Sequence, residues 1–302
     1  MISLREAFGN ALVKLADKKD FVVLDADVSG GTNTNYFKKA YPSRFIQCGI
    51  AEQNMMSVAS GLCNSGLLPI VTAYGVFATL RPLDQIRNSI AYPNTNVKIV
   101  ASHPGLDVGP DGATHQAIED LSVMRSLPNM VVISPCDDIE VLSATKIILD
   151  YKGPVYMRSG RSPVPTVNKK DYTFEIGKGT VLKEGAGIIV IFATGIMVHR
   201  AIEASKNDNR VVVINISTIK PIDKDIIIKY AKEAEHVLSC EDHNIIGGLG
   251  SAISEVLSEN AIATNFIRIG IKDIYGLSGE PEELAELYGI STTSIRKVIN
   301  EF

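Results

Sequence analysis

The sequence predicts an α/β fold of two three-layer domains, each a mostly parallel sheet between two layers of helices. Three observations lead to this prediction. Short β-rich runs alternate with helix-length segments, the alternation stops once near residues 160 to 176, and it then resumes. A chain of 302 residues, 45% of them hydrophobic, is long enough to bury two such cores.

The first unit, residues 1–165, is predicted to open with a helix. Ser3 and Glu6 match a capping box, and Leu4, Phe8 and Leu12 then fall on one helical face. Runs of β-branched residues follow, separated by helix-length stretches. The predicted strands are 21–27, 68–74, 96–102, 130–135 and 155–158.

The break in the pattern contains two prolines, polar residues and no periodicity, as a connection between domains would. The second unit is therefore predicted over residues 176–302. Glu280 and Pro281 suit the start of a late helix, since proline is tolerated at the first helical position. The predicted strands are 187–195, 210–218, 236–240 and 266–271.

Composition and charge exclude several classes of function. Thirty basic and 34 acidic residues give a net charge of -4, which argues against nucleic-acid binding. No apolar run approaches the roughly 18 residues of a membrane span, and no secretory pattern is present, so we expect no membrane association and a cytoplasmic location. The four cysteines show no CxxC spacing, which favours reduced thiols over a disulfide frame or a zinc site.

The stretch "GIAEQNMM" places Glu52 between a strand-like run and a small, apolar segment. An acid in the first turn of a helix complements the helix dipole, which is one explanation. The other is an acid set into a cleft at the carboxyl end of a strand, where α/β sheets bind ligands. Position alone leaves both explanations open.

The loop "SHPGLDVGPDGATHQ" gathers His103, Asp111 and His115 after another predicted strand. It lacks the helix-fixed spacing of known metal motifs, so no metal site is predicted in this chain. Paired imidazoles that bind hydroxyls or move protons fit the loop better. An Asx turn at Asp111 is the structural alternative.

Other candidates follow strands. Arg158, at a strand end, suits a bidentate phosphate contact, whereas Arg161 is interpreted as a solvated charge. Tyr74 and Phe77 suit either core packing or a flat wall for a heteroaromatic ring. The late glycine cluster "IIGGLGSAI" places Ile253 where a dinucleotide fingerprint needs its third glycine, and a tight strand-to-helix turn explains it.

Four stretches, "GIAEQNM", "GPDGATHQAIEDL", "MRSGRSPVP" and "EDHNIIGGLGSAI", resemble in order and spacing the carboxyl-terminal half of transketolase, in the form divided between two chains. The resemblance covers essentially the whole chain. "GIAEQ" is shared with other thiamine diphosphate enzymes, while "DGATHQ" preceded by His103 is more particular to transketolase. The resemblance implies a pyrimidine-binding domain, a transketolase C-terminal-like domain, and transfer of a two-carbon unit from a ketose phosphate to an aldose phosphate in the pentose phosphate pathway.

The resemblance also implies roles for single residues. Glu52 matches the acid that hydrogen-bonds the aminopyrimidine ring of the cofactor and so activates it. Tyr74 takes the place of a phenylalanine that stacks on this ring, but Thr72-Ala73-Tyr74 departs from the usual serine-threonine-phenylalanine run, so Phe77 is an alternative.

On the substrate side, the resemblance assigns sugar contacts. His103 and His115 match histidines that contact substrate hydroxyls or the reacting carbonyl, and Asp111 matches an aspartate that reads a hydroxyl of the donor. Arg158 and Arg5 match arginines that hold the sugar phosphate. The second domain offers no such residue and is interpreted as an assembly module.

A missing motif implies a partner. The family binds the diphosphate through Mg²⁺ with a Gly-Asp-Gly sequence, which this chain lacks. We therefore expect an amino-terminal transketolase subunit to supply the magnesium ligands, in an α2β2 assembly, and expect the chain alone to be inactive. Alternatives are a beta subunit of 2-oxo acid dehydrogenase type, a specialised sugar-phosphate transketolase and a non-catalytic homologue.

Overall fold

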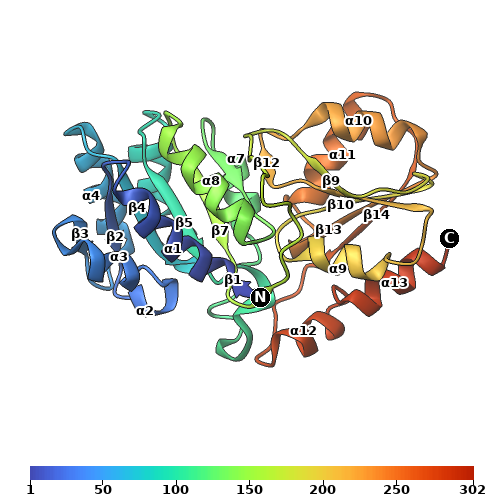
Figure 1. The fold of residues 1–302 in the computed structure, drawn as a ribbon, viewed down its shortest axis with the longest axis horizontal. Coiled ribbons are helices and arrows are strands. Elements are labelled where there is room, and N and C mark those ends of the chain that lie inside the picture. Colours follow the sequence, from blue (N-terminus) through green and yellow to red (C-terminus); the bar gives the residue numbers. More distant parts are fainter.

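The computed structural model describes residues 1–302, and Figure 1 shows its two sheets side by side. In the first sheet every neighbouring pair is parallel except β12 with β6. Its inner strands are buried, which explains why they read as nearly continuous apolar runs. In spatial order they are β12 (Thr218–Lys220), β6 (Val131–Ile133), β7 (Val155–Ser159), β5 (Lys98–Ser102), β4 (Pro69–Tyr74), β2 (Val22–Asp25) and β3 (Phe45–Gln47).

Helices cover both faces of this sheet. Neighbouring residues of a strand point to opposite sides, and in these strands both sets are apolar, so each face must be buried. On β2, Val23 packs against one layer and Leu24 against the other. The first layer comprises α1 (Leu4–Ala16), α3 (Asn35–Ala40) and α8 (Asp138–Asp150). The second comprises α4 (Glu52–Asn64), the π-helix η2 (Ile86–Ala91) and α7 (Asp120–Ser126).

The predicted capping residue begins α1: Ser3 Oγ accepts the N–H of Glu6 at 3.3 Å. Shorter elements complete this unit: α2 (Ser29–Thr32), η1 (Pro42–Arg44), α5 (Gly75–Thr79), α6 (Leu83–Gln85), the 3₁₀ segment η3 (Gly105–Asp111), and β1 (Ile2–Ser3) paired with β8 (Pro163–Val164).

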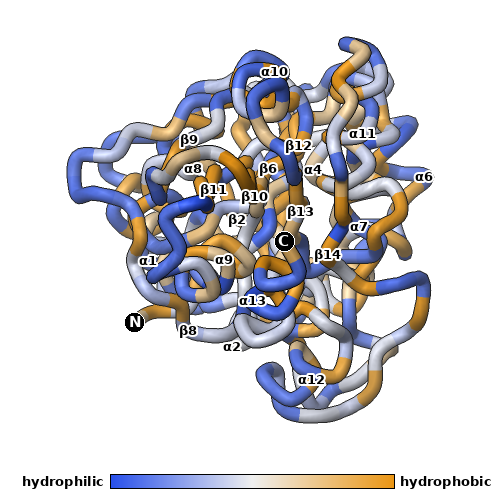
Figure 2. The backbone as a smooth tube through the Cα atoms, turned by 90° about the vertical axis from the view of Figure 1, so that its right-hand side faces the viewer, coloured by the Kyte–Doolittle hydropathy of each residue, from blue (hydrophilic) through white to orange (hydrophobic).

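The second sheet is parallel except for its edge strand β9. Its order is β14 (Asn265–Ile271), β13 (His236–Asn244), β10 (Ile189–Ala193), β11 (Val211–Asn215) and β9 (Thr180–Lys183). One face is covered by α9 (Met197–Ala204), α12 (Pro281–Leu287) and α13 (Thr292–Asn300), and the other by α10 (Lys224–Glu233) and α11 (Leu249–Glu259). Figure 2 shows the apolar character of central strands such as β10.

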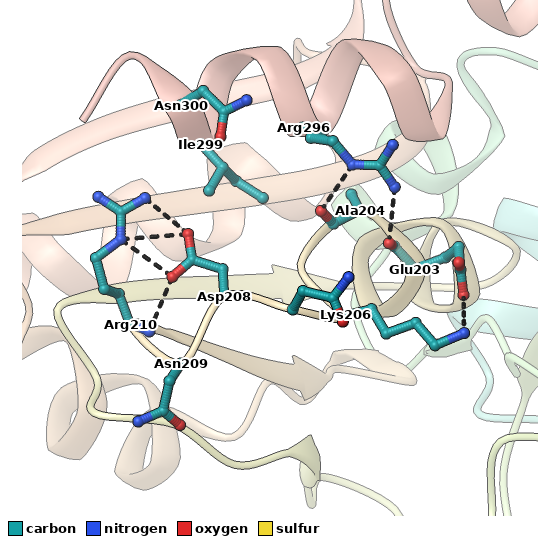
Figure 3. A pocket seen from close by; sticks show the side chains of 10 residues that line it. Glu203, Ala204, Lys206, Asp208, Asn209, Arg210, Arg296, Ile299 and Asn300 are labelled. Atoms are coloured by element: carbon teal, nitrogen blue, oxygen red, sulfur yellow. Dashed lines mark hydrogen bonds and ion pairs between the residues drawn. The ribbon is translucent and has the colours of Figure 1, made fainter.

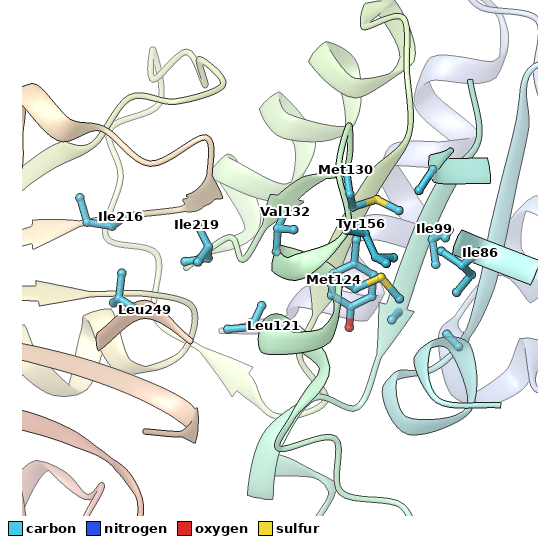
Figure 4. Close-up of a cluster of buried hydrophobic side chains, with 14 of the residues drawn as sticks. Ile86, Ile99, Leu121, Met124, Met130, Val132, Tyr156, Ile216, Ile219 and Leu249 are labelled. Atoms are coloured by element: carbon cyan, nitrogen blue, oxygen red, sulfur yellow. The ribbon is translucent and has the colours of Figure 1, made fainter. Parts of the chain in front are cut away.

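The two units share a core and a strand. After β11 the chain crosses to the first sheet, where β12 pairs antiparallel with β6. Figure 4 shows Leu121 and Val132 of the first unit next to Ile219 and Leu249 of the second, all within one buried cluster. The predicted α/β class and two-sheet organisation are confirmed, whereas this shared strand was not predicted.

Candidate functional site

Glu52 is the first residue of α4, directly after the loop that leaves β3. Gly49 turns this loop with a φ of 71°, a conformation that glycine adopts without strain. The side chain of Glu52 is 7% exposed, and its Oε1 accepts a hydrogen bond from Arg81 Nη1 at 3.1 Å. It lines an open hollow, together with residues 50–54 and Arg81. The acid is therefore shielded, yet borders a space that a ligand can reach.

Aromatic side chains lie beside this acid. Tyr74 ends β4 and Phe77 lies in α5, and their rings stack with centroids 6.2 Å apart. The guanidinium of Arg81 lies 4.0 Å from the centre of the Phe77 ring, so it links Phe77 to Glu52. A carboxylate beside an aromatic face suits a flat, nitrogen-containing ring such as an aminopyrimidine. Both predicted stacking residues are in the site, and Phe77 is the one joined to Glu52.

His103 sits where β5 ends and is 3% exposed. Its Nδ1 lies 2.8 Å from Ser102 Oγ, and Arg5 Nη1 lies 3.4 Å from its Nε2. Burial, followed by the charges of Arg5 and Arg161, lowers the pKa of His103 to about 3. The imidazole is therefore neutral near pH 7 and suited to hydrogen bonding with a hydroxyl or carbonyl. The ring of Tyr74 packs on it, with centroids 4.1 Å apart.

Cationic and acidic groups surround this histidine. Arg5 donates to Gly31 O at 2.8 Å, and its buried Nε has no hydrogen-bond partner. Burial, and then the charge of Arg161, lower the pKa of Arg5. Arg161 pairs with Asp111 at 3.7 Å, and both remain partly exposed. These two cations and one acid form a charged cluster beside His103, and its guanidinium groups suit an anionic sugar.

His115 lies next to the aromatic rings of Tyr74 and Phe77. It is half-buried, and its ring meets that of Phe77 edge to face with centroids 5.1 Å apart. Its Nδ1 lies 3.0 Å from Thr114 Oγ1. The fold thus brings Glu52, Tyr74, Phe77, His103, His115, Asp111 and Arg5 to one end of the first sheet, at the carboxyl ends of β3, β4 and β5, where such sheets bind ligands.

Arg158 is an exception and corrects the prediction of a phosphate contact. It is 4% exposed, and its Nε donates to Asp120 Oδ2 at 2.8 Å, while its Nη2 pairs with Asp120 Oδ1. Its Nη1 donates to the Asp242 carbonyl at 3.0 Å. The guanidinium is committed to protein partners between the two units, so it is a structural group that reaches no ligand.

Two residues of the site were missed or misread. Arg161 was interpreted as a solvated charge, because nothing in "MRSGRSP" shows which arginine turns inward from the strand. Arg81 lies in the same run as Tyr74 and Phe77, and an arginine four residues after an aromatic on a helical path was a signal that could have drawn attention to it.

Another hollow lies far from this site, between α9, α13 and the turn before β11. In Figure 3 its charged side chains already have partners: Arg210 is paired with Asp208, and Arg296 donates to the carbonyls of Glu203 and Ala204. These contacts stabilise the turn and leave no free cation directed at a ligand. No group of three or more histidines, cysteines and acids is placed to hold a metal, and no helix is long and apolar enough to cross a membrane.

Comparison with known proteins agrees with this geometry. Residues 1–166 match the family model of the transketolase pyrimidine-binding domain, and residues 177–295 match that of the transketolase C-terminal domain. These two matches define a thiamine diphosphate-dependent, transferase-type class of enzyme. The chain belongs to the transketolase family, and within it corresponds to the carboxyl-terminal section.

Three similar proteins illustrate this relationship. A Methanocaldococcus jannaschii protein provisionally described as a transketolase C-terminal section is 44% identical, and the match covers 99% of this chain and 95% of that protein. A 6-deoxy-6-sulfo-D-fructose transketolase subunit from Clostridium sp. is 36% identical over 99% of this chain and 94% of its own. A solved split-gene transketolase, an inactive beta4 tetramer, has a TM-score of 0.91 and 44% identity, covering 100% of this chain and 98% of that one.

Proposed function

We propose that this chain is the pyrimidine-binding subunit of a two-chain transketolase that moves a two-carbon ketol unit from a ketose phosphate to an aldose phosphate. The observation that carries the proposal is the shielded carboxylate of Glu52, which Arg81 joins to the ring of Phe77. Thiamine diphosphate, when bound, supplies a nucleophilic carbon and an electron sink. Glu52 would hydrogen-bond a ring nitrogen of its aminopyrimidine, and Phe77 would support the plane of that ring.

The remaining site residues have roles toward the sugar. His103, which is neutral near pH 7, would hydrogen-bond substrate hydroxyls and the reacting carbonyl, as would His115, and Asp111 would accept from a donor hydroxyl. Arg5 and Arg161 would bind the terminal anion of the sugar, in place of the pair Arg5 and Arg158. Both cations would favour charged over uncharged substrates.

A second subunit would complete the site. The chain has no Gly-Asp-Gly motif for the diphosphate and Mg²⁺, and we assign both to an amino-terminal subunit in an α2β2 assembly. Beside the hollow of Glu52, Ile50 is 76% exposed and Leu80 is 38% exposed. A subunit that covers this hollow would remove both apolar side chains from water. The solved relative is described as a split-gene transketolase and the Clostridium relative as a subunit, and both descriptions support this division.

The charged cluster that contains Arg5 and Arg161 also suits a second candidate, a transketolase for a specialised sugar. A guanidinium binds phosphate and sulfonate oxygens by the same bidentate contact. The Clostridium relative carries a sulfo sugar in its name. Assays with xylulose 5-phosphate and with a 6-sulfo ketose as donors distinguish the two candidates.

The decisive test is reconstitution with the amino-terminal subunit from the same host, followed by an assay of ribose 5-phosphate with xylulose 5-phosphate. We expect sedoheptulose 7-phosphate from the complex and none from either subunit. Glu52→Gln should lower kcat by at least about a hundredfold, the range expected for a positioned acid–base group, with subunit assembly intact. Exposed Glu301→Gln, remote from the site, is the matched control. Turnover near the wild-type rate in the Glu52 variant would refute the role of the acid.

A further inference from the structure

The loop with His103, Asp111 and His115 packs along its length against the carboxyl-terminal domain. In Figure 1 this blue-green stretch lies next to α12, and η3 contacts both α12 and β13. The carboxyl-terminal domain supplies no residue to the site around Glu52 and His103. Any influence that it has on this site must therefore pass through its contacts with the loop.

The loop glycines are shaped to these contacts. Gly105 has a φ of 65°, and a Cβ there would lie 2.0 Å from Asp242 Oδ2. Gly112 has a φ of 75°, and a Cβ there would lie 2.4 Å from Ser278 Oγ. Both glycines permit a left-handed backbone and a close approach by the second domain at once. Gly105 and Gly112 therefore allow the loop to pack closely against the second domain.

Hydrogen bonds fix both ends of the loop to the second domain. Near its start, the N–H of Leu106 donates to Asp242 Oδ1 at 3.0 Å. Near its end, Gln116 Nε2 donates to the carbonyl of Leu277 at 2.9 Å. Asp242 is 4% exposed and Gln116 is 3% exposed, so both bonds are shielded from water. Each anchor lies within three residues of a site histidine.

Arg158, on strand β7 of the first sheet, contacts the main chain at both Asp242 and the end of the loop. Its Nη1 donates to the main-chain carbonyl of Asp242 at 3.0 Å, and its Nη2 donates to that of Ala117 at 3.4 Å. The pair that it forms with Asp120 holds this guanidinium in place. One buried cation thereby connects the first sheet, the end of the loop and strand β13.

We propose that the carboxyl-terminal domain positions the substrate loop, with Asp242 and Gln116 as positioning residues that act through Leu106 and Leu277. The inference rests on the proposed function, because it assigns the loop to sugar binding. It replaces the interpretation of this domain as an assembly module. The "EDH" run near the end of β13, for which the sequence indicated no role of its own, thereby gains a function, since Asp242 is its central residue.

The first test is hydrogen–deuterium exchange of the reconstituted complex. In Asp242→Ala, amides of residues 103–116 should exchange about tenfold faster, the change expected when one buried hydrogen bond is lost. Asp242→Asn keeps an oxygen that can accept from Leu106 and should restore the slow rate. Gln116→Ala is the second variant, should Asp242→Ala not fold. Asp225→Ala, an exposed acid of the same domain, is the matched control.

The second test separates positioning from general stability. In Asp242→Ala and Gln116→Ala the KM for both sugars should rise about tenfold for one lost bond, while the Kd of thiamine diphosphate, measured by calorimetry, changes less than about twofold. Loop exchange at the wild-type rate in both variants, or an equal increase in Asp225→Ala, would overturn the proposal. The exchange readout needs no turnover, so it stands even if the complex proves not to be a transketolase.

Discussion

Arg158 and Arg161 lie three positions apart, yet the structure gives them opposite environments. Removing Arg158 leaves the carboxylate of Asp120 buried without its cation, so Arg158→Met should lower the free energy of unfolding by about 3–5 kcal/mol. Arg161 is partly exposed, and Arg161→Met should change stability little. Urea denaturation of both variants checks this difference.

We expect substitutions of Arg158 and Arg161 to affect substrate binding in different ways. In Arg161→Met the KM for a phosphorylated acceptor should rise about tenfold more than that for an unphosphorylated one, because one charged contact is lost. In Arg158→Met any loss should be equal for both acceptors. A phosphate-selective loss in Arg158→Met, with an unchanged denaturation midpoint, would restore the assignment made from the sequence.

At the scale of an element, Asp137 joins helix α8 to the segment between the domains. Its Oδ1 accepts the N–H of Glu140 at 2.8 Å, and its Oδ2 accepts those of Val167 and Asn168 at 2.8 and 2.6 Å. Asp137→Ala removes a helix cap and leaves shielded donors unpaired, so the free energy of unfolding should fall by at least about 2 kcal/mol.

The measurement is urea denaturation, together with the rate of proteolytic cleavage within residues 165–176, which should rise in Asp137→Ala. Asp138→Ala is the neighbouring control, because its bond to Thr166 is exposed and should contribute little. If the two variants lose equal stability, then Asp137 does not anchor the segment.

The elements themselves were largely predictable. The nine strands expected from β-rich runs are present, since each run is bounded by polar or turn residues and long enough to show its character. The strand β12 was missed because three residues before a proline carry no periodicity. Its pairing with β6 depends on contacts made only when both sheets are assembled.

For the whole molecule, pH should act on stability through a buried acid of the second domain. Glu241 is fully buried and accepts N–H bonds from Leu249 and Gly250, and burial raises its pKa to about 7. The unfolded chain releases this proton near pH 4.5. Between these values the folded state holds the extra proton, so this group lowers the free energy of unfolding as pH rises, by up to about 1.4 kcal/mol per pH unit.

Glu241→Gln removes this titration. The stability advantage of the wild-type chain over the variant should therefore be larger at pH 5 than at pH 7.5, as measured by urea denaturation at both pH values. Comparing the two chains cancels the contributions of groups that do not contact residue 241. His243, whose Nδ1 lies 3.6 Å from Glu241 Oε2, has a pKa that burial lowers to about 4, so it is neutral at both pH values. A difference that does not vary with pH would contradict the assignment.

The sequence by itself determined the two-sheet α/β class, the position of His103 after a predicted strand, and the family, because periodicity and short motifs are local properties of a chain. The tertiary structure decided which arginine is buried, that Arg81 joins Glu52 to Phe77, and that Asp242 reaches Leu106. These facts depend on side chains that meet across distant segments. Burial and pairing decide whether a charge holds the fold or faces a ligand, and local sequence encodes neither.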